Sequence, residues 1–222
     1  MLIKRQMDDD LKDLSNLLDD MEKGCLSMLE KWLDAVLEGK ENLISEIFDM
    51  EVEVNRCQMK VDDLVWKIMA LYQPAASELR ILIGAIKIAE DLERVGDEVC
   101  AMCRRTVELA NIAQLEFPGV FIEMRTMVKT LFKDSIFAVK KLDPEMAESI
   151  FIADNAIDDA FQTLFEWARN SLENKIGNTD NILAVLSMGR SLERIADHAT
   201  NLAEITIFMK KGQDVRHHCL KF

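Results

Sequence analysis

Two carboxylate pairs repeat along the sequence with the spacing of one face of a helix. The hexamers LERVGD and LERIAD are nearly the same, and the second begins 100 residues after the first. Each carries a glutamate four residues before an aspartate: Glu93 with Asp97, and Glu193 with Asp197. On a helix, this spacing brings the two like charges together, and they repel by roughly 0.2–0.5 kcal/mol. A bound cation would neutralise them, and oxygen-only ligands suit hard cations such as Mg, Ca or Mn, with iron also open.

A further acidic pair has the same four-residue spacing. Asp154 and Asp158 lie in IADNAIDD, and their counterparts in the first half are Glu51 and Asn55. If these segments are helices antiparallel to those with the hexamers, the acidic side chains of the two helices in each half face each other across a groove. We call the line of acidic residues on one helix face a stripe. Asn201 continues the second-half stripe and adds an amide oxygen. The sequence therefore predicts one acidic patch in each half of the chain.

Basic residues near the hexamers differ between the two halves. Arg94 stands four residues after Glu90, so the two can form an ion pair. This pair does not relieve the repulsion between Glu93 and Asp97. Arg190 takes the place of Glu90 in the second half, so this pair is absent there. In a chain with 40 Asp and Glu residues, acidic pairs at this spacing are also typical of a solvated helix face, and that alternative stays open.

Histidine and cysteine side chains are interpreted as structural. His198 follows the second hexamer without a metal-binding partner, so we expect a local polar contact. Cys100 and Cys103 form a CxxC motif within a helical pattern and without a second such motif, which favours buried small hydrophobic residues over a zinc or redox site. The 5 cysteines are odd in number and scattered, as suits a reducing compartment.

Apolar residues recur with a helical period over six long segments, and the low glycine (8) and proline (3) content disfavours a turn-rich β fold. The expected helices cover about residues 7–37, 41–72, 77–110, 121–141, 144–175 and 180–210. Short connections make neighbouring helices antiparallel. The sequence therefore predicts an all-α fold of two tandem antiparallel three-helix bundles, residues 1–115 and 116–222, which arose by internal duplication.

The third helix of each half carries its hexamer next to an apolar seam that suits a bundle core. The seam residues are Ala85, Ile88, Leu92, Val95, Val99 and Met102 in the first half, and Val185, Met188, Leu192, Ile195, Ala199 and Leu202 in the second. At the end of the fourth helix, Asp143 can cap the fifth, with Pro144 at its first position.

The bulk properties exclude several classes of protein. A net charge of −13 repels phosphate backbones, so direct nucleic-acid binding is disfavoured. The N-terminus becomes acidic before any apolar signal region, and the apolar run ILIGAIKIA is too short to span a bilayer. We therefore expect a soluble, cytoplasmic protein that contacts membranes only through partners.

The chain resembles the PhoU family along nearly its whole length. The resemblance is carried by QPAASELR, by LERVGD and LERIADHATNLAE on the two third helices, and by a C-terminal DVRH. It implies two similar three-helix bundles that bind metal through E(D)xxxD motifs on their surfaces. The implied metal ligands are Glu93, Asp97, Glu193, Asp197, Asp154, Asp158 and Asn201.

The first repeat departs from this pattern at three positions. Ala101 stands where Asn201 would be matched, Asn55 replaces the carboxylate of Asp158, and Glu98 replaces His198. The first site is therefore expected to bind metal differently from the second, or not at all.

The resemblance implies a non-enzymatic negative regulator of phosphate uptake and phosphate-starvation signalling. Its expected partners are the ATPase subunit of the phosphate ABC transporter and a sensor histidine kinase. The metal ion or cluster would be iron, zinc, manganese or magnesium. Homodimerisation stays open, because amphipathic periodicity does not separate packing within a chain from packing between chains.

Two other functions are compatible with a helical bundle. One is a metal-free scaffold for protein assembly. The other is a di-metal carboxylate enzyme, which requires Glu-x-x-His motifs whose ligands project into a four-helix core. Gly96 and Ala196 occupy the histidine positions, so the sequence disfavours the enzyme.

Overall fold

The computed structural model describes residues 2–38, 40, 42–108 and 117–215. These residues form six α-helices and no strand, which confirms the all-α prediction. The helices are α1 (Leu2–Glu38), α2 (Asn42–Tyr72), α3 (Ala76–Glu108), α4 (Gly119–Lys141), α5 (Pro144–Glu173) and α6 (Thr179–Lys211). The helix α1 begins earlier than the predicted residue 7. The predicted end of the third helix at residue 110 and the boundary between residues 115 and 116 lie outside the described residues.

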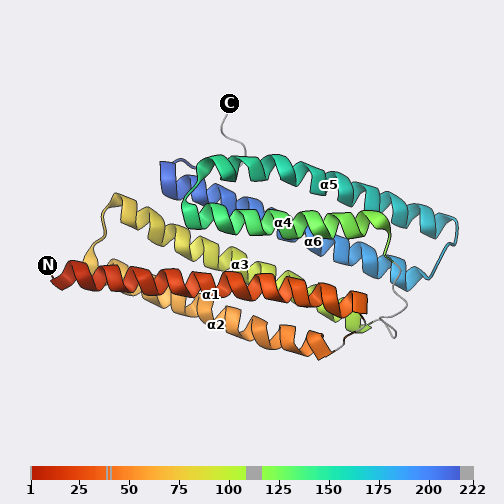
Figure 1. Cartoon of the computed structure of the whole chain (residues 1–222), viewed down its shortest axis with the longest axis horizontal. Coiled ribbons are helices and arrows are strands. Elements are labelled where there is room, and N and C mark those ends of the chain that lie inside the picture. The colour runs from red at the N-terminus through yellow and green to blue at the C-terminus, as the bar shows by residue number, and fades with distance from the viewer. Residues whose placement is uncertain (1, 39, 41, 109–116, 216–222) are drawn as a thin grey trace.

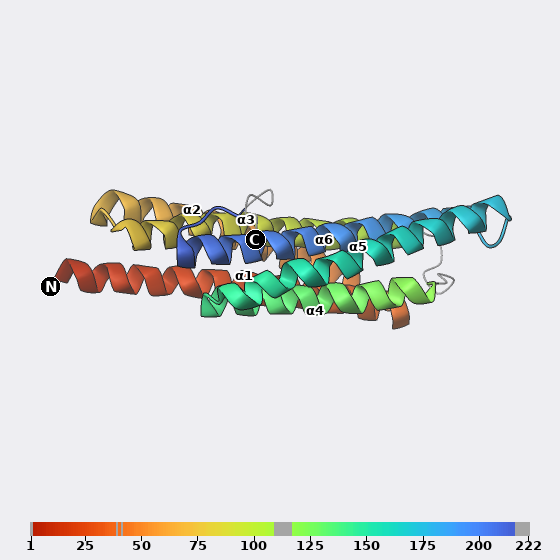
Figure 2. The same cartoon turned by 90° about the horizontal axis from the view of Figure 1, so that it is seen from above.

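The six helices pack as two groups of three (Figure 1). In the first group α1, α2 and α3 contact one another, and in the second group α4, α5 and α6 do so. The groups meet mainly where α3 packs against α6, and Figure 2 shows these two helices side by side in the middle of the molecule. Both views place α1 and α4 along one shared face. No helix in the described part of the chain is long and apolar enough to cross a membrane.

The predicted seams of α3 and α6 are buried as expected. All twelve seam residues are at most 2% exposed, and they belong to one hydrophobic core that is continuous between the two bundles. Fully burying one aliphatic side chain stabilises the fold by about 1.5–3 kcal/mol. Burial of the seams therefore supplies much of the driving force for packing the helices into one core.

Local signals in the sequence set the ends of the second-half helices. The Asp143 side chain accepts hydrogen bonds from the backbone N–H groups of Glu145 and Met146, and Pro144 occupies the first turn of α5, as predicted. Asn178 caps α6 in the same way. At the other end of α6, Gly212 adopts a left-handed conformation (φ 70°) that favours glycine.

Polar contacts cross between the bundles at the α3–α6 interface. Asp91 Oδ1 on α3 accepts a hydrogen bond from Asn201 Nδ2 at 2.9 Å and lies 2.9 Å from His198 Nδ1, both on α6. Farther along, Arg194 Nη1 lies 2.7 Å from Glu98 Oε1. Residue numbers rise along α3 as those of the partners fall along α6, so the two helices are antiparallel.

We expect Asp91→Ala to lower the free energy of unfolding by about 1–3 kcal/mol, because the buried His198 and the partly buried Asn201 lose their shared acceptor. Urea denaturation followed by circular dichroism measures this loss. Asp159→Ala on the exposed face of α5 is the control and should change stability by less than about 0.5 kcal/mol. Equal stability of the two variants would show that the Asp91 contact does not hold the interface.

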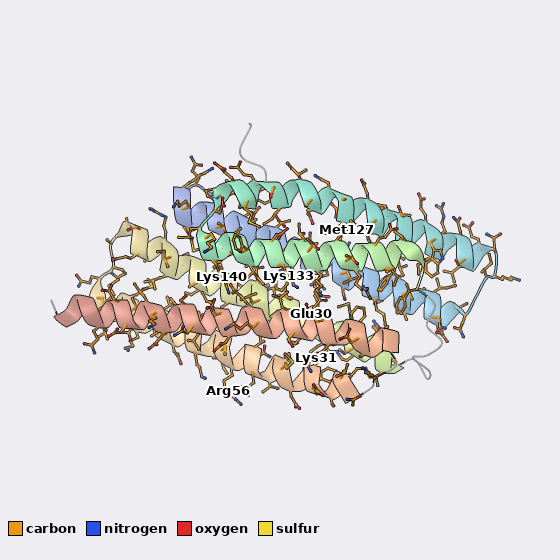
Figure 3. All side chains as sticks on the ribbon, viewed as in Figure 1. Glu30, Lys31, Arg56, Met127, Lys133 and Lys140 are labelled. Atoms are coloured by element: carbon orange, nitrogen blue, oxygen red, sulfur yellow. The ribbon has the colours of Figure 1, made fainter. Side chains whose placement is uncertain are left out.

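Lysine side chains join α1 and α4 on the other side of the molecule (Figure 3). Glu30 on α1 forms ion pairs with two lysines of α4: its Oε1 atom lies 2.8 Å from Lys129 Nζ and 3.2 Å from Lys133 Nζ. Lys140 lies 2.9 Å from Asp19 and 2.8 Å from Glu22. Glu22 is only 3% exposed, and this burial raises its pKa to about 7, although the Lys140 ammonium opposes the shift.

Glu22 should make stability depend on pH in a defined direction. Because its pKa is higher in the folded than in the unfolded state, its contribution is most favourable below about pH 4.5 and is lost as pH rises through 7. We expect Glu22→Gln to be more stable than the wild type at pH 8 by roughly 3 kcal/mol at most, with the difference vanishing near pH 4.5. Denaturation at a series of pH values tests this, with the exposed Glu123→Gln as control. A variant less stable than the wild type at pH 8 would mean that the ion pair with Lys140 outweighs the cost of burial.

Candidate metal centre

The second-half patch is built by two neighbouring antiparallel helices. Asp154 and Asp158 on α5 lie one turn apart, as do Glu193 and Asp197 on α6. The pKa of Asp154 is raised to about 6, first by burial and then by the negative charges of Asp158, Asp197 and Glu193. Burial and the charge of Asp158 also raise the pKa of Asp197. The structure thus brings together the four carboxylates that the sequence predicted.

An arginine that the sequence interpretation overlooked contacts this patch. Arg190 Nη1 lies 2.6 Å from Glu193 Oε1, three residues along α6, and its guanidinium also lies 5.6 Å from the centre of the Phe161 ring. The comparison of the two repeats treated Arg190 only as the replacement of Glu90. Its spacing of three residues to Glu193, which allows an ion pair on a helix, was the signal that could have revealed this contact. The expected Arg94–Glu90 pair in the first half is present at 2.6 Å.

Glu193 keeps one oxygen without a partner. Its Oε2 atom is buried and has no hydrogen bond among the described residues, while Oε1 contacts Arg190. Burial raises the pKa of Glu193 more than Arg190 lowers it. A buried, unpaired carboxylate oxygen costs free energy unless a cation or proton meets it.

The first-half patch has three carboxylates and one amide. The pKa of Glu93 on α3 is raised by burial, then by Asp97, with a smaller contribution from Glu51 on α2. Asn55 Nδ2 donates to Glu51 Oε1 at 2.6 Å, whereas Asn55 Oδ1 is buried and has no hydrogen-bond partner in the described part of the chain. Among the described residues, each patch therefore contains a buried oxygen without a hydrogen-bond partner, Asn55 Oδ1 in the first and Glu193 Oε2 in the second.

These donor sets suit a hard cation. Carboxylate and amide oxygens are preferred ligands of Mg and Mn, and a cation would relieve the mutual repulsion within each patch. No group of three or more His, Cys, Asp or Glu side chains in the described residues is already arranged to hold a metal ion. Side-chain rotation would be needed before the carboxylates could converge on one ion.

Asn201 is placed differently from the four carboxylates. Its amide nitrogen donates to Asp91 across the α3–α6 interface, beside His198. Its role as a metal ligand stays a prediction. His198 makes a polar contact, as expected, but the partner lies 107 residues away on α3 and could not be found from local sequence.

The CxxC cysteines have the environment of core residues. Cys100 and Cys103 are at most 1% exposed, and burial raises the pKa of each thiol to about 12. Thiols with raised pKa values are poor nucleophiles and poor metal ligands at neutral pH. The geometry supports the interpretation of these cysteines as small hydrophobic residues.

Comparison with known proteins agrees with this architecture. The PhoU domain matches the chain twice, at residues 18–106 and 121–206. The chain belongs to the PhoU family. The PhoU homolog of Pseudomonas putida, a phosphate-specific transport system accessory protein, is 32% identical over 190 residues, which cover 84% of this chain and 73% of the relative. The corresponding protein of Pseudomonas aeruginosa is 28% identical over 218 residues, covering 97% and 89%.

Solved PhoU structures have the same fold. The crystal structure of PhoU from Pseudomonas aeruginosa matches with a TM-score of 0.86 and 26% identity, covering 93% of this chain and 99% of that one. The PhoU structure from Streptococcus pneumoniae also has a TM-score of 0.86, at 22% identity. The resemblance to PhoU found in the sequence and its six-helix fold are therefore confirmed.

A metal at the second-half patch should invert the effect of Asp197→Asn on stability. In EDTA, we expect the variant to be at least as stable as the wild type, because one repelling charge is gone. With Mn²⁺ at about 100 times its dissociation constant, the wild type should gain about 2.7 kcal/mol and the variant much less. Thermal denaturation of both proteins in EDTA and in Mn²⁺ measures these differences in stability.

The matched control for this prediction is Asp159→Asn, which removes a charge from α5 outside the patch. Elemental analysis should also show a larger loss of metal in Asp197→Asn than in Asp97→Asn, because the second patch has four carboxylates. Identical metal content and stabilisation in all variants would exclude both patches as metal sites.

Proposed function

We propose that this protein is a non-enzymatic, metal-binding regulator of phosphate uptake and phosphate-starvation signalling. It acts as a negative regulator in the cytoplasm, through contacts with the ATPase subunit of the phosphate ABC transporter and with a sensor histidine kinase. The observation that carries the proposal is the match, over most of the chain, to accessory proteins of phosphate-specific transport systems.

The form of the molecule supports a role in binding other proteins. Its six helices offer long, continuous faces, and each half presents one acidic patch between two helices. A bound ion of iron, zinc, manganese or magnesium would neutralise a patch and fix its side chains. Metal occupancy would then change the charge that a partner meets on this face.

A di-metal carboxylate enzyme is supported less well. Gly96 and Ala196 stand where that chemistry needs histidine, and Ala196 is buried in the core. The candidate ligands also lie on the flanks of three-helix bundles, not within a four-helix core. The metal-free scaffold is the remaining alternative, and metal content of the purified protein separates it from the proposal.

Deletion of the gene tests the regulatory part. In phosphate-rich medium, we expect the deletion strain to express phosphate-starvation genes that the parent keeps repressed. A transcriptional reporter measures this change. Repression that is unchanged by the deletion would contradict a negative regulatory role.

Complementation separates regulation from metal binding. The wild type and Asp159→Asn should restore repression, and the double variant Asp97→Asn/Asp197→Asn should restore it only partly. Full restoration by the double variant at equal protein level would contradict a regulatory role of the metal and leave the regulator itself supported.

A further inference from the structure

A pocket lies at the junction of the two bundles, beside the C-terminal end of α4. Lys140 contacts Asp19 and Lys133 contacts Glu30, so α4 runs antiparallel to α1. The helix α4 ends one residue after Lys140, whereas α1 continues past this point toward its N-terminus (Figure 1). At this step a pocket of about 280 Å³ opens between α1, α3 and the ends of α4 and α6.

The floor of the pocket is apolar and comes from four helices. It is formed by Leu14, Ala85, Ile88, Val139 and Met209. Each of these residues is at most 8% exposed. Ile81 on α3 also lines the pocket and is 38% exposed, so the apolar surface continues to the opening. Such a surface favours a ligand with an apolar body, because the ligand removes this surface from water.

One side of the pocket is charged. Glu22 is only 3% exposed, and its buried Oε2 atom lies 2.8 Å from Lys140 Nζ at an angle that forms no hydrogen bond. The same ammonium lies 2.9 Å from Asp19. Lys23 is the other cation near Glu22, but it is exposed and pairs with Asp20 at 3.9 Å. Two carboxylates of the pocket therefore share one ammonium.

This charge balance selects the head group of a ligand. With both carboxyl groups ionised, Asp19, Glu22 and Lys140 together carry one net negative charge. A ligand ammonium would give each carboxylate a cation of its own, and charge-assisted hydrogen bonds in a buried place are strong. A ligand carboxylate would instead add a third negative charge beside a single ammonium. The pocket thus favours a cationic head over an anionic one.

The size of the pocket favours a small molecule over a segment of a partner protein. Its volume is close to the lower end of the about 300–1,000 Å³ that small-molecule sites occupy. A partner helix with its side chains is about 10–12 Å across and would not enter. An unbranched chain of several methylene groups matches the narrow apolar floor.

We propose that this pocket binds a small amphipathic amine, with its protonated amino group at Asp19 and Glu22 and its aliphatic chain along the floor. The inference goes beyond the regulatory function proposed above and does not depend on it. It is also separate from metal binding, because none of the pocket residues belongs to the two acidic patches.

Isothermal titration calorimetry in EDTA at pH 8 tests the ligand class, with n-octylamine, octanoate and 1-octanol as probes. At this pH Glu22, whose pKa is raised to about 7 by burial, is mostly ionised, while an alkylamine stays protonated. We expect octylamine to bind most tightly of the three. From butylamine to octylamine, each methylene group should raise the affinity up to about fourfold. Absence of octylamine binding, or octanoate binding as tightly, would overturn the proposal.

Two substitutions at the charged side test the site itself. Glu22→Gln should weaken octylamine binding at least about tenfold, because a charged hydrogen bond is lost. Lys140→Met should bind octylamine at least as tightly as the wild type, because the competing ammonium is gone. The exposed Glu123→Gln on α4 is the control and should bind as the wild type does. Unchanged binding in Glu22→Gln, or weaker binding in Lys140→Met, would contradict the proposed site.

A substitution in the floor tests where the chain lies. Ala85→Leu fills part of the pocket and should weaken the binding of octylamine and octanol alike. Far-UV circular dichroism checks that each variant keeps its helices, and Glu22→Gln, which keeps the shape of the side chain, decides the outcome if Ala85→Leu does not fold. Octylamine binding unaffected by a folded Ala85→Leu would place the ligand elsewhere and overturn the proposal.

Discussion

The packing of α3 against α6 is the contact on which the rest of the molecule depends. Both helices place a continuous apolar seam at the centre of the fold, and these seams join the two bundles into one core. The hexamer carboxylates lie directly beside the seams, where Glu93 and Glu193 are half-buried while Asp97 and Asp197 are exposed. Loss of hydration is the largest cause of the raised pKa values of Glu93 and Glu193.

The acidic patches follow from this constraint together with the neighbouring helix. Because α2 and α5 pack against the hexamer helices, their carboxylates lie within electrostatic reach of the hexamer carboxylates. In the second half, Arg190 neutralises only one oxygen of Glu193. A bound cation would neutralise the remaining negative charge of the patch. This electrostatic argument connects the fold with the proposed metal binding.

The two halves share a scaffold but differ in what they present. The second patch has four carboxylates, whereas the first has three and the amide of Asn55. At the interface, Asp91 meets His198 and Asn201, while the equivalent of Asp91 in α6 is Ser191. On their outer faces, both α2 and α5 expose large apolar side chains, among them Met59 and Trp66 on α2 and Ile152 and Phe165 on α5. The two repeats therefore share an apolar core but differ in their polar contacts and in the ligands that their patches offer.

The sequence by itself determined the helices, the seams and the clustering of the carboxylates. Periodicity set the seams, Asp143 and Pro144 marked the start of α5, and the four-residue spacing put each carboxylate pair on one face. These features depend on residues close together in the chain. Short connections then left little choice about which helices are antiparallel neighbours.

Only the tertiary structure decided the contacts between residues far apart in the chain. Two such contacts join the halves of the chain, Asp91 with His198 and Lys140 with Glu22. Local sequence patterns do not predict them. The same holds for burial: Glu22 and Asp63 are both acids on amphipathic helices, yet one is enclosed between α1 and α4 while the other faces solvent. Periodicity gives the face of a helix on which a side chain lies, but the neighbouring helix determines whether that face meets water, an ion or another protein.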